Sequence, residues 1–362
     1  MVRLGDVCKK ASSNIAQKDL EGHSGKYPIY GASGLIKHVD FYQQEQPYIA
    51  VVKDGAGIGR VMKLPAKSSV IGTMQYIIPN DIVDISYLAY AMEYMNLSKY
   101  FSGATIPHIY FKDYQKETLP LPALDEQRRI ATTLDKVSDL ISKRRQQLDK
   151  LDELVKARFV EMFGDPATNP KGWDKGTIRD VVTEVKYGTS KPAVEGGTYK
   201  YLRMGNITYD GHLDLTDLKY IDVPESELDK CTVKKGDVLF NRTNSKELVG
   251  KTCVYNLDET MVIAGYIIRV RVNNRVLPEY LSAVLNSSYG KKTLAEMCKA
   301  IVGQANINAQ ELQYIQIVIP PLELQYEFLK VIQKIEKINL PISRSLEKLQ
   351  TLKKALMQEY FK

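Results

Sequence analysis

The chain has 362 residues, of which 44% are hydrophobic and 26% charged; this length favours two or more domains, and no stretch reaches the roughly 20 apolar residues of a membrane span. The N-terminal MVRLGDVCKK lacks the apolar core of a secretory signal, and the four scattered cysteines form no CxxC pair, which disfavours disulfide and zinc sites and predicts a reducing, cytoplasmic compartment. The formal charge of +7 permits a polyanionic partner without requiring one.

Residues 1–118 contain short β-like runs between Gly, Asn and Asp turns, which predicts a small, mostly β domain with one helix. The runs are YPIYGASG, QPYIAVVK, RVMKL and TMQYIIP. The loop AVVKDGAGIGRV at 50–61 carries Lys53, three glycines and Arg60. Such a loop can approach phosphates closely, and its side chains can read base edges. An ordinary hairpin loop with solvated charge is the alternative.

After residue 120 the pattern changes to apolar residues at alternating steps of three and four, which predicts a long helix with a heptad seam. Pro122 and Asp125 suit the start of a helix, and Gly164 with Pro166 suits its end. The seam consists of Leu134, Val137, Ile141, Leu148, Leu151, Val155 and Met162, with Arg144 and Arg158 in two of its turns. A single apolar stripe on a helix in water has to be buried.

Residues 165–317 repeat the mostly β pattern, in TYKYLRMGNI, DVLFNR, KTCVYN and YIIRVRV. The loop FNRTNSKELVGKT at 240–252 offers Arg242, Asn244, Lys246 and Lys251 as DNA-contacting residues, again with a solvated hairpin loop as the alternative. Other loop-like stretches of both domains add Tyr30, Ser33, His108, Arg203, Asn206 and Gln304.

A second heptad pattern closes the sequence. Its seam is formed by Ile332, Ile335, Ile342, Leu346, Leu349, Leu356 and Tyr360, with the polar residues Asn339 and Lys353 on the same frame. Pro341 lies inside this pattern and is expected to kink or break the helix.

The two helical segments are related by a gapless repeat with an offset of 198 residues. Pro122 matches Pro320, and Gln127 matches Gln325. Leu4-Gly5-Asp6-Val7 resembles Ile178-Arg179-Asp180-Val181 in the β-rich parts. The chain therefore reads as two diverged copies of one unit, and the economical arrangement is an antiparallel helix pair. The alternative is that each helix folds back on its own domain.

No catalytic constellation is evident. GKT at 250–252 lacks the glycine that a phosphate-binding loop needs at 245, where Ser245 stands. GAGIGR at 55–60 is not GxGxxG, and no [DN]PP[YF] tetrapeptide for amino-methyl transfer is present. The four histidines have no metal-ligand spacing, so the sequence predicts no metal site.

Together these stretches resemble the DNA-specificity subunit of type I restriction-modification systems. The resemblance rests on YPIYGASG, VVKDGAGIGRV, LPLPALDEQRRIA, ARFVEMFGDPATNPKGW, GDVLFNRTNS and VIPPLELQ, in the family's order and over nearly the whole length. It implies an α+β fold with a target-recognition domain at 1–120, a central helix at 121–163, a second recognition domain at 164–318 and a C-terminal helix at 319–362. The two mostly β domains would be joined by the helices as an antiparallel coiled coil with an internal pseudo-two-fold.

The resemblance also implies a function in bacterial defence. Each domain would bind one half of a bipartite, asymmetric double-stranded DNA target, and the helical spacer would fix the gap and dock two methyltransferase (modification) subunits. Two restriction subunits would join them. This chain would be non-catalytic and without a cofactor, because S-adenosylmethionine, ATP and Mg would act in the partner subunits. The competing hypotheses are a coiled-coil scaffold that binds protein or glycan, and an enzyme with a hidden nuclease site.

Overall fold

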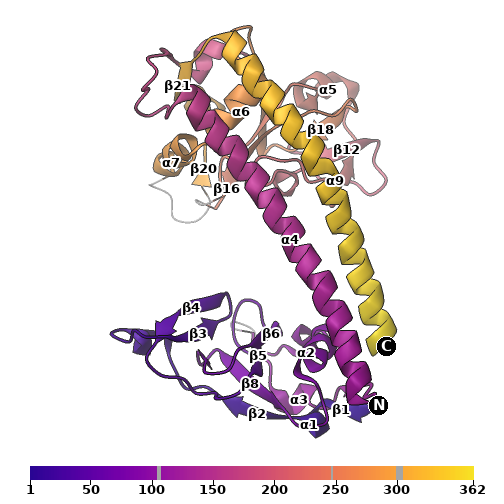
Figure 1. Cartoon of the computed structure of the whole chain (residues 1–362). Coiled ribbons are helices and arrows are strands. Elements are labelled where there is room, and N and C mark those ends of the chain that lie inside the picture. Colours follow the sequence, from indigo (N-terminus) through magenta and orange to yellow (C-terminus); the bar gives the residue numbers. More distant parts are fainter. Residues whose placement is uncertain (104–106, 246–247, 299–304) are drawn as a thin grey trace. The chain divides into compact units, whose positions relative to one another are not determined.

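The computed structural model describes residues 1–103, 107–245, 248–298 and 305–362 and divides into two compact units (Figure 1). Unit 1 consists of Met1–Gln146 with Ser343–Lys362, and unit 2 of Gln147–Ile342. Each unit therefore contains one β-rich domain, the near part of one long helix and the near part of the other. The units are described separately.

Unit 1 is built on an antiparallel sheet of order β2-β8-β5-β6, beside a smaller sheet of order β4-β3-β7 and the short pair β1-β9. Its elements before the long helix are β1 (Val2–Arg3), α1 (Leu4–Val7), β2 (Cys8–Ser12), η1 (Gln17–Leu20), β3 (Tyr27–Gly31), β4 (Gly34–Val39), β5 (Tyr48–Val52), β6 (Val61–Leu64), β7 (Ser69–Val70), β8 (Met74–Pro79), α2 (Ile85–Tyr94), η2 (Leu97–Tyr100), α3 (Phe111–Tyr114) and β9 (Thr118–Leu119).

The run YIAVV forms the central strand β5. All five residues are apolar because the strand is buried on both faces. Ile49 and Val51 pack against α2 and the long helices, whereas Tyr48, Ala50 and Val52 pack against the other face of the sheet. Figure 1 shows α2 between this sheet and the long helix α4.

Unit 2 repeats this topology. Its main sheet has the order β11-β19-β15-β17, and its second sheet has the order β13-β12-β18-β14, with the pairs β10-β21 and β16-β20 beside them. Its elements are β10 (Asp174–Thr177), η3 (Ile178–Val181), β11 (Val182–Tyr187), β12 (Tyr199–Leu202), η4 (Met204–Asn206), β13 (Lys219–Ile221), α5 (Glu225–Cys231), β14 (Thr232–Val233), β15 (Val238–Asn241), β16 (Thr243–Asn244), β17 (Thr252–Val254), β18 (Met261–Ile263), β19 (Ile267–Val272), α6 (Pro278–Asn286), α7 (Ser288–Met297), β20 (Ala305–Asn306), α8 (Ala309–Gln313) and β21 (Gln316–Ile319).

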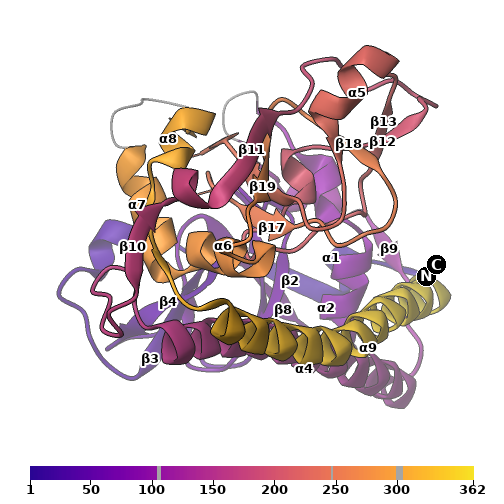
Figure 2. The same ribbon diagram turned by 90° about the horizontal axis from the view of Figure 1, so that it is seen from above.

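In both units the smaller sheet contains one parallel strand pair, which is β3 with β7 in unit 1 and β12 with β18 in unit 2. The expectation of one helix per domain is wrong, because unit 1 adds the short α1 and α3 to the predicted α2, and unit 2 adds α5, α7 and α8 to the predicted α6. Figure 2 shows α6 between the main sheet of unit 2 and the long helices.

The long helices are α4 (Leu124–Phe163) and α9 (Leu322–Phe361). They run antiparallel, because the end of α4 meets the start of α9 in unit 2, while the start of α4 meets the end of α9 in unit 1. α4 ends at Gly164, whose φ of 79° and close approach to Pro170 exclude a side chain. α9 is continuous through Pro341, so the expected break is absent; the ring lies on the exposed face of the helix.

The helices pack on the β domains as well as on each other. Phe159 and Phe163 of α4 join Phe328 of α9 in the core of unit 2. Met357 and Phe361 of α9 join the core of unit 1. The two arrangements that the sequence left open are therefore combined, and the predicted fold class is confirmed: α+β, two mostly β domains, two long antiparallel helices and an internal repeat.

Candidate nucleic-acid interface

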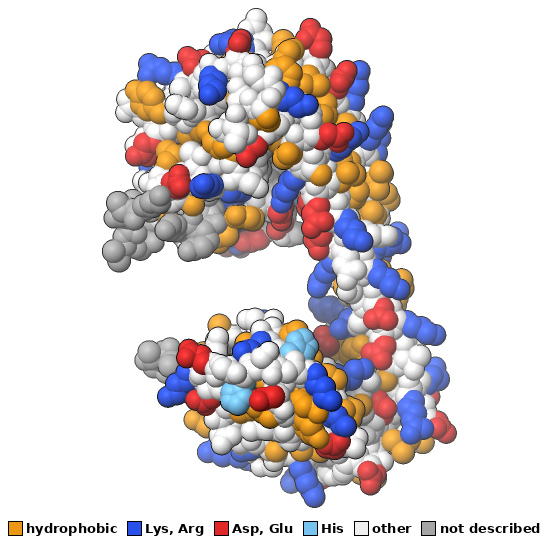
Figure 3. Space-filling model, turned by 60° about the vertical axis from the view of Figure 1, so that its left-hand side comes forward, with side chains coloured by type: hydrophobic (Ala, Val, Ile, Leu, Met, Phe, Trp, Pro, Cys, Tyr) orange, Lys and Arg blue, Asp and Glu red, His pale blue; other side chains and the backbone are white. Residues whose placement is uncertain are grey.

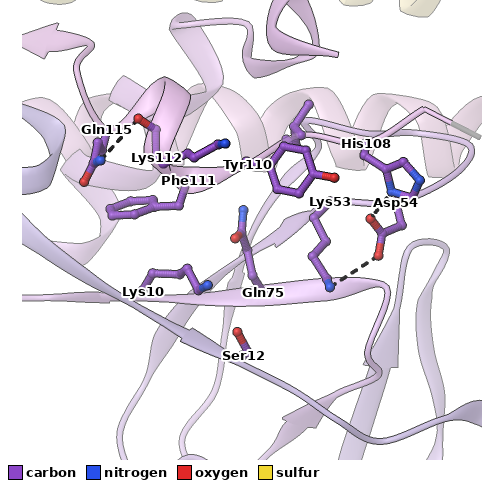
Figure 4. Close-up of a pocket in the computed structure, with 11 residues that line it drawn as sticks. Lys10, Ser12, Lys53, Asp54, Gln75, His108, Tyr110, Phe111, Lys112 and Gln115 are labelled. Atoms are coloured by element: carbon purple, nitrogen blue, oxygen red, sulfur yellow. Dashed lines mark hydrogen bonds and ion pairs between the residues drawn. The ribbon is translucent and has the colours of Figure 1, made fainter. Parts of the chain in front are cut away.

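A cluster of polar side chains lies where β5 of unit 1 ends. Lys53 Nζ lies 3.3 Å from Asp54 Oδ2, and His108 Nδ1 lies 2.6 Å from Asp54 Oδ1. The backbone fixes this geometry, because the N–H of Ile109 donates to the carbonyl of Lys53 at 2.9 Å. All three side chains are partly exposed (Figure 4). Asp54 thus brings together Lys53 and His108, which the sequence analysis had selected separately.

The end of β15 in unit 2 carries a cluster of the same construction. The N–H of Ile307 donates to the carbonyl of Arg242 at 2.9 Å. Thr243 pairs with Asn306 across β16 and β20, and the Thr243 hydroxyl donates to Asn306 Oδ1 at 3.2 Å. The strand registers make Arg242 the counterpart of Lys53. One backbone frame therefore carries Lys-Asp with His in unit 1, and Arg-Thr with Asn in unit 2.

Arg242 is also held by an aromatic ring. Its guanidinium lies 4.8 Å from the ring centroid of Tyr187, and its Nε is buried without a hydrogen-bond partner among the described residues. Both residues line a pocket of about 350 Å³ that includes the Lys191–Glu227 ion pair. A guanidinium stacked on a ring keeps its planar edge for a bidentate acceptor such as phosphate or guanine.

Unit 1 has a larger open pocket of about 600 Å³ beside its strand-end cluster (Figure 4). Lys10 and Ser12 come from β2, Gln75 from β8, and Phe111 and Lys112 from α3. Sequence reasoning missed these residues, because their segments are distant in the chain and only the sheet order brings them together. Lys112, four residues after the predicted contact His108, was the available signal.

The glycine loop after Lys53 has a structural explanation. Gly55, Gly57 and Gly59 all have φ near +80°, and a side chain at Gly59 would come within 2.4 Å of the Ser98 nitrogen. The turn therefore depends on glycine irrespective of any ligand.

Arg60 closes this loop onto the β3–β4 turn, because its Nη1 donates to the Ala32 carbonyl at 2.6 Å. The neighbouring Ser33 is exposed, whereas Tyr30 is half-buried and packs against the core between the two sheets. Arg60 and Ser33 are thus brought to one edge of the domain, and Tyr30 is turned partly inward.

Two residues of unit 2 that were predicted to contact DNA, Arg203 and Asn206, make hydrogen bonds within one loop. The Asn206 side chain is buried, accepts from the Arg203 N–H at 2.8 Å, and donates to the carbonyls of Asp214 and Asp217. Arg203 forms an ion pair with Asp217 at 2.7 Å. The polar groups of Asn206 are therefore occupied by the protein itself.

The remaining loop candidates have mixed outcomes. Asn244 lies in β16, where its Oδ1 accepts from the Ser245 N–H at 2.8 Å, and Lys251 is half-buried before β17. Lys246 and Gln304 lie outside the described residues.

The predicted seam is buried most deeply near the domains. Leu134, Val137 and Ile141 of α4 and Ile335 of α9 are buried. The other seam residues are partly exposed: Leu148, Leu151, Val155, Ile332, Ile342, Leu346, Leu349 and Leu356. Sequence reasoning missed the more deeply buried aromatic residues Phe159 and Phe328, whose rings pack on each other and, for Phe159, on Tyr280 of the β domain.

Lys353, expected in the helix seam, instead contacts the β domain of unit 1. Its Nζ lies 3.0 Å from Glu93 Oε1 and 5.2 Å from the ring centroid of Tyr90.

A half-buried lysine of unit 2 has a buried amine. Lys291 of α7 has its Nζ 4.4 Å from the ring centroid of Tyr209 and has no hydrogen-bond partner for that nitrogen among the described residues. Burial lowers the pKa of Lys291 to about 8; Asp210 opposes this effect, and the nearby Lys156 and Lys251 add to it. A negatively charged ligand nearby would therefore raise the pKa of Lys291 and favour its protonated form.

Neither a metal-binding cluster nor a membrane-spanning helix is present in the described ranges. Within 1–103, 107–245, 248–298 and 305–362, no group of three or more His, Cys, Asp or Glu side chains is placed to hold a metal ion. In the same ranges, no helix combines the length and apolarity needed to cross a bilayer.

The folded chain is thus a tandem protein in which two related β domains present equivalent but chemically different polar clusters. The sequence model of the family described as "Type I restriction modification DNA specificity domain" matches residues 1–152 and 170–353. Because the match covers both copies and most of the chain, the protein belongs to the family of type I restriction-modification DNA specificity subunits.

Named relatives agree with this assignment. The chain is 23% identical to the EcoKI specificity subunit of Escherichia coli (strain K12), over 92% of this chain and 78% of that protein. It is 25% identical to the MjaVIII specificity subunit of Methanocaldococcus jannaschii, over 99% of this chain and 90% of that protein. The crystal structure of the type I restriction-modification S subunit from M. genitalium has the same fold, with a TM-score of 0.58 at 16% identity, covering 100% of this chain and 95% of that one.

Proposed function

We propose that each unit of this specificity subunit reads one half of a bipartite, asymmetric DNA target. The observation that carries the proposal is the pair of strand-end clusters, with Lys53 in one and Arg242 in the other on equivalent backbone frames. Phosphate contacts position a protein on DNA, whereas base-edge contacts specify the sequence. Two domains that bind different half-sites therefore need the same backbone arrangement with different side chains.

The surface of unit 1 suits such contacts. Lys, Arg and His side chains are interspersed with carboxylates and apolar groups on its β domain in Figure 3. Mixed polarity of this kind supports base reading alongside phosphate binding, and the chain's modest net charge of +7 suits a subunit that shares its grip on DNA with partners.

The helices α4 and α9 would act as the spacer between half-sites and as the docking surface for two methyltransferase subunits. In support, several apolar side chains of these helices remain exposed: Leu140, Leu154, Val160, Ile338, Leu340 and Leu352. Exposed apolar residues on otherwise charged helices are typical of surfaces that a partner covers.

The chemistry would take place on the partners. Adenine methylation with S-adenosylmethionine would belong to the modification subunits, and ATP- and Mg-dependent cleavage to two restriction subunits. This chain would supply only recognition and spacing. Methylation of a base inside a duplex requires that base to be flipped out, so the assembled complex has to hold distorted DNA.

The proposal is tested by co-expressing the chain with its neighbouring methyltransferase and mapping methylated adenines across the host DNA. We expect a split motif with a fixed central gap. Methylation that is absent, or identical without this chain, would reject DNA specificity and favour the scaffold hypothesis. Metal-dependent cleavage by the purified chain alone would instead reveal a nuclease.

A further inference from the structure

The space between β2 and α3 that belongs to the open pocket of unit 1 is crossed by a side chain at the corresponding place in unit 2. Ser12 pairs with Gln75 across β2 and β8, and Tyr187 pairs with Ile268 across β11 and β19, so Tyr187 is the counterpart of Ser12. The Tyr187 hydroxyl accepts from the N–H of Ala309 at 2.7 Å. Its side chain therefore spans from β11 to α8, across the space that lies open between β2 and α3 in unit 1.

The charges of the pocket are also particular to unit 1. Lys10, Lys53 and Lys112 line it, and Lys10 and Lys112 have no carboxylate partner among the described residues. By strand register, Val185 stands at the counterpart of Lys10. By the offset of 198, Gln310 stands at the counterpart of Lys112. Two cations of the open space in unit 1 therefore have no cationic counterpart in unit 2, which points to an anionic ligand rather than to a requirement of the shared scaffold.

The other walls suit a planar heterocycle. Tyr110 is 49% exposed at the rim, and Phe111 lies beside it. The Gln75 side chain is only 3% exposed, and its single hydrogen-bond partner among the described residues is the Tyr114 hydroxyl. Figure 4 shows the Gln75 amide directed toward the space below Tyr110 and Phe111. An amide at the floor can hydrogen-bond a base edge, while aromatic rings provide stacking surfaces.

We propose that this pocket holds one nucleotide, with its phosphate on Lys10 and Lys112 and its base between the aromatic rim and the Gln75 amide. The volume of about 600 Å³ is in the range of pockets that bind small molecules. Given the proposed DNA-reading function, the nucleotide is one displaced from the stack in the half-site of unit 1, distinct from the adenine that is methylated. Unit 2, in which Tyr187 crosses the corresponding space, reads its half-site without this displacement.

The first test uses the complex of the full chain with its modification subunits, bound to its mapped DNA target. 2-Aminopurine replaces each base of the unit 1 half-site in turn, because its fluorescence rises when it unstacks. We expect a rise at one position besides the methylated adenine. Ser12→Tyr, which copies the side chain of unit 2, should abolish that rise and leave the rise at the methylated adenine. Ser12→Ala, which keeps the space open, should retain both.

A second test separates the phosphate contacts from the space. Lys112→Gln should reduce the salt dependence of DNA binding by about one counterion and abolish the second unstacking event, although the pocket stays open. Lys9→Gln, which removes the same charge from an exposed position of β2 outside the pocket, is the matched control for the position of the charge. Loss of the second unstacking event in Lys9→Gln as well would contradict the assignment to this pocket.

Titration of the full chain with each 5′-deoxymononucleotide and with inorganic phosphate identifies the source of the ligand. Mononucleotide binding weakened about tenfold by Ser12→Tyr or Lys112→Gln, without unstacking in DNA, assigns the pocket to a free nucleotide. No second unstacked position and no such binding would overturn the proposal. If the complex does not bind DNA at all, the proposed function fails, and the mononucleotide titration still decides the pocket.

Discussion

Gln127 and Gln325, 198 residues apart, make the same three hydrogen bonds in the two units. Gln127 accepts from the N–H of Asp84 at 2.9 Å and donates to the carbonyls of Ile82 and Pro122 at 3.1 and 2.8 Å. Gln325 accepts from the N–H of Leu277 at 2.8 Å and donates to the carbonyls of Arg275 and Pro320 at 3.1 and 2.8 Å. Each glutamine thereby fixes the start of a long helix to its β domain.

Replacing either glutamine should destabilise one unit. Gln127→Ala removes the partner of one part-buried N–H and two carbonyls, and each polar group that is left buried and unpaired costs about 1–3 kcal/mol in typical proteins. We expect hydrogen exchange to accelerate in unit 1 for Gln127→Ala and in unit 2 for Gln325→Ala. Gln146→Ala, on the exposed surface of α4, is the control and should change neither. Equal acceleration in both units from one substitution would contradict this local role.

The ends of the helices lock the units by the same repeat. In unit 2, Phe163 of α4 packs on Tyr280 with 4.9 Å between the ring centroids. In unit 1, the counterpart pair is Phe361 of α9 and Tyr87, with 5.1 Å between the ring centroids. Phe361→Ala should therefore destabilise unit 1 by about 3–5 kcal/mol, although the residue lies at the far end of the sequence. Leu352→Ala, at an exposed position of α9, is the control. Protection of β5 and β8 that survives Phe361→Ala would disprove this contribution.

The sequence predicted the repeat because the residues that anchor the helices have few substitutes. The repeat keeps a proline before each helix and a buried glutamine with three hydrogen-bond partners. These matches establish the alignment of the two copies, which apolar matches alone would not reveal. The paired strand-end clusters were only half predictable: Lys53 and Arg242 were identified from their loops, but Asp54 and Asn306 join the clusters through cross-strand pairing.

The pocket beside β5 was not predictable, because its residues come from segments near 10, 75 and 112 that only the strand order joins. Pro341, in contrast, led to the prediction of a break in the helix that the structure does not have. A proline inside a helix removes one N–H donor, yet α9 continues through Pro341. The helix is stabilised by packing on both sides of the proline, because its earlier residues join the core of unit 2 and its later residues join the core of unit 1.

Lys53 and Arg242 should each govern one half of the target. Lys53→Gln is expected to relax base preference within one half of the methylation motif, and Arg242→Gln within the other half. A bidentate or charged base contact contributes about 1–3 kcal/mol of discrimination, so roughly tenfold relaxation at one position is expected. The controls Lys9→Gln and Lys175→Gln remove equal charge from exposed strand positions of the two units. Relaxation of both halves by one substitution would refute separate readers.

Lys291 should make the stability of unit 2 depend on alkaline pH. Burial depresses its pKa from 10.5 to about 8 in the folded state. Between those two values the unfolded chain binds more protons, so this residue makes stability rise as the pH increases from about 8 toward 10.5. Lys291→Met removes the buried charge and should raise the melting temperature at pH 7, with a gain that shrinks across this window. Lys292→Met, at the exposed neighbouring position, is the control; an equal gain at all pH values would contradict the assignment.

The length of the helices should set the gap between the half-sites. Deleting one heptad from each helix, residues 142–148 of α4 and 340–346 of α9, preserves the heptad phase and removes matched lengths at the repeat-related positions. Seven residues of helix correspond to about 10 Å, or about three base pairs of DNA. Mapping of methylated adenines should therefore return the same two half-sites with a shorter gap.

The control for the spacer is deletion of residues 142–148 alone. Helices of unequal length cannot hold both ends in their cores, because Phe163 and Phe361 each pack in a different unit. The single deletion should therefore lower the stability of at least one unit and weaken methylation without defining a new gap. If the matched deletion methylates the original motif with its original gap, the spacer does not measure the distance, and the gap is then fixed by the methyltransferase subunits.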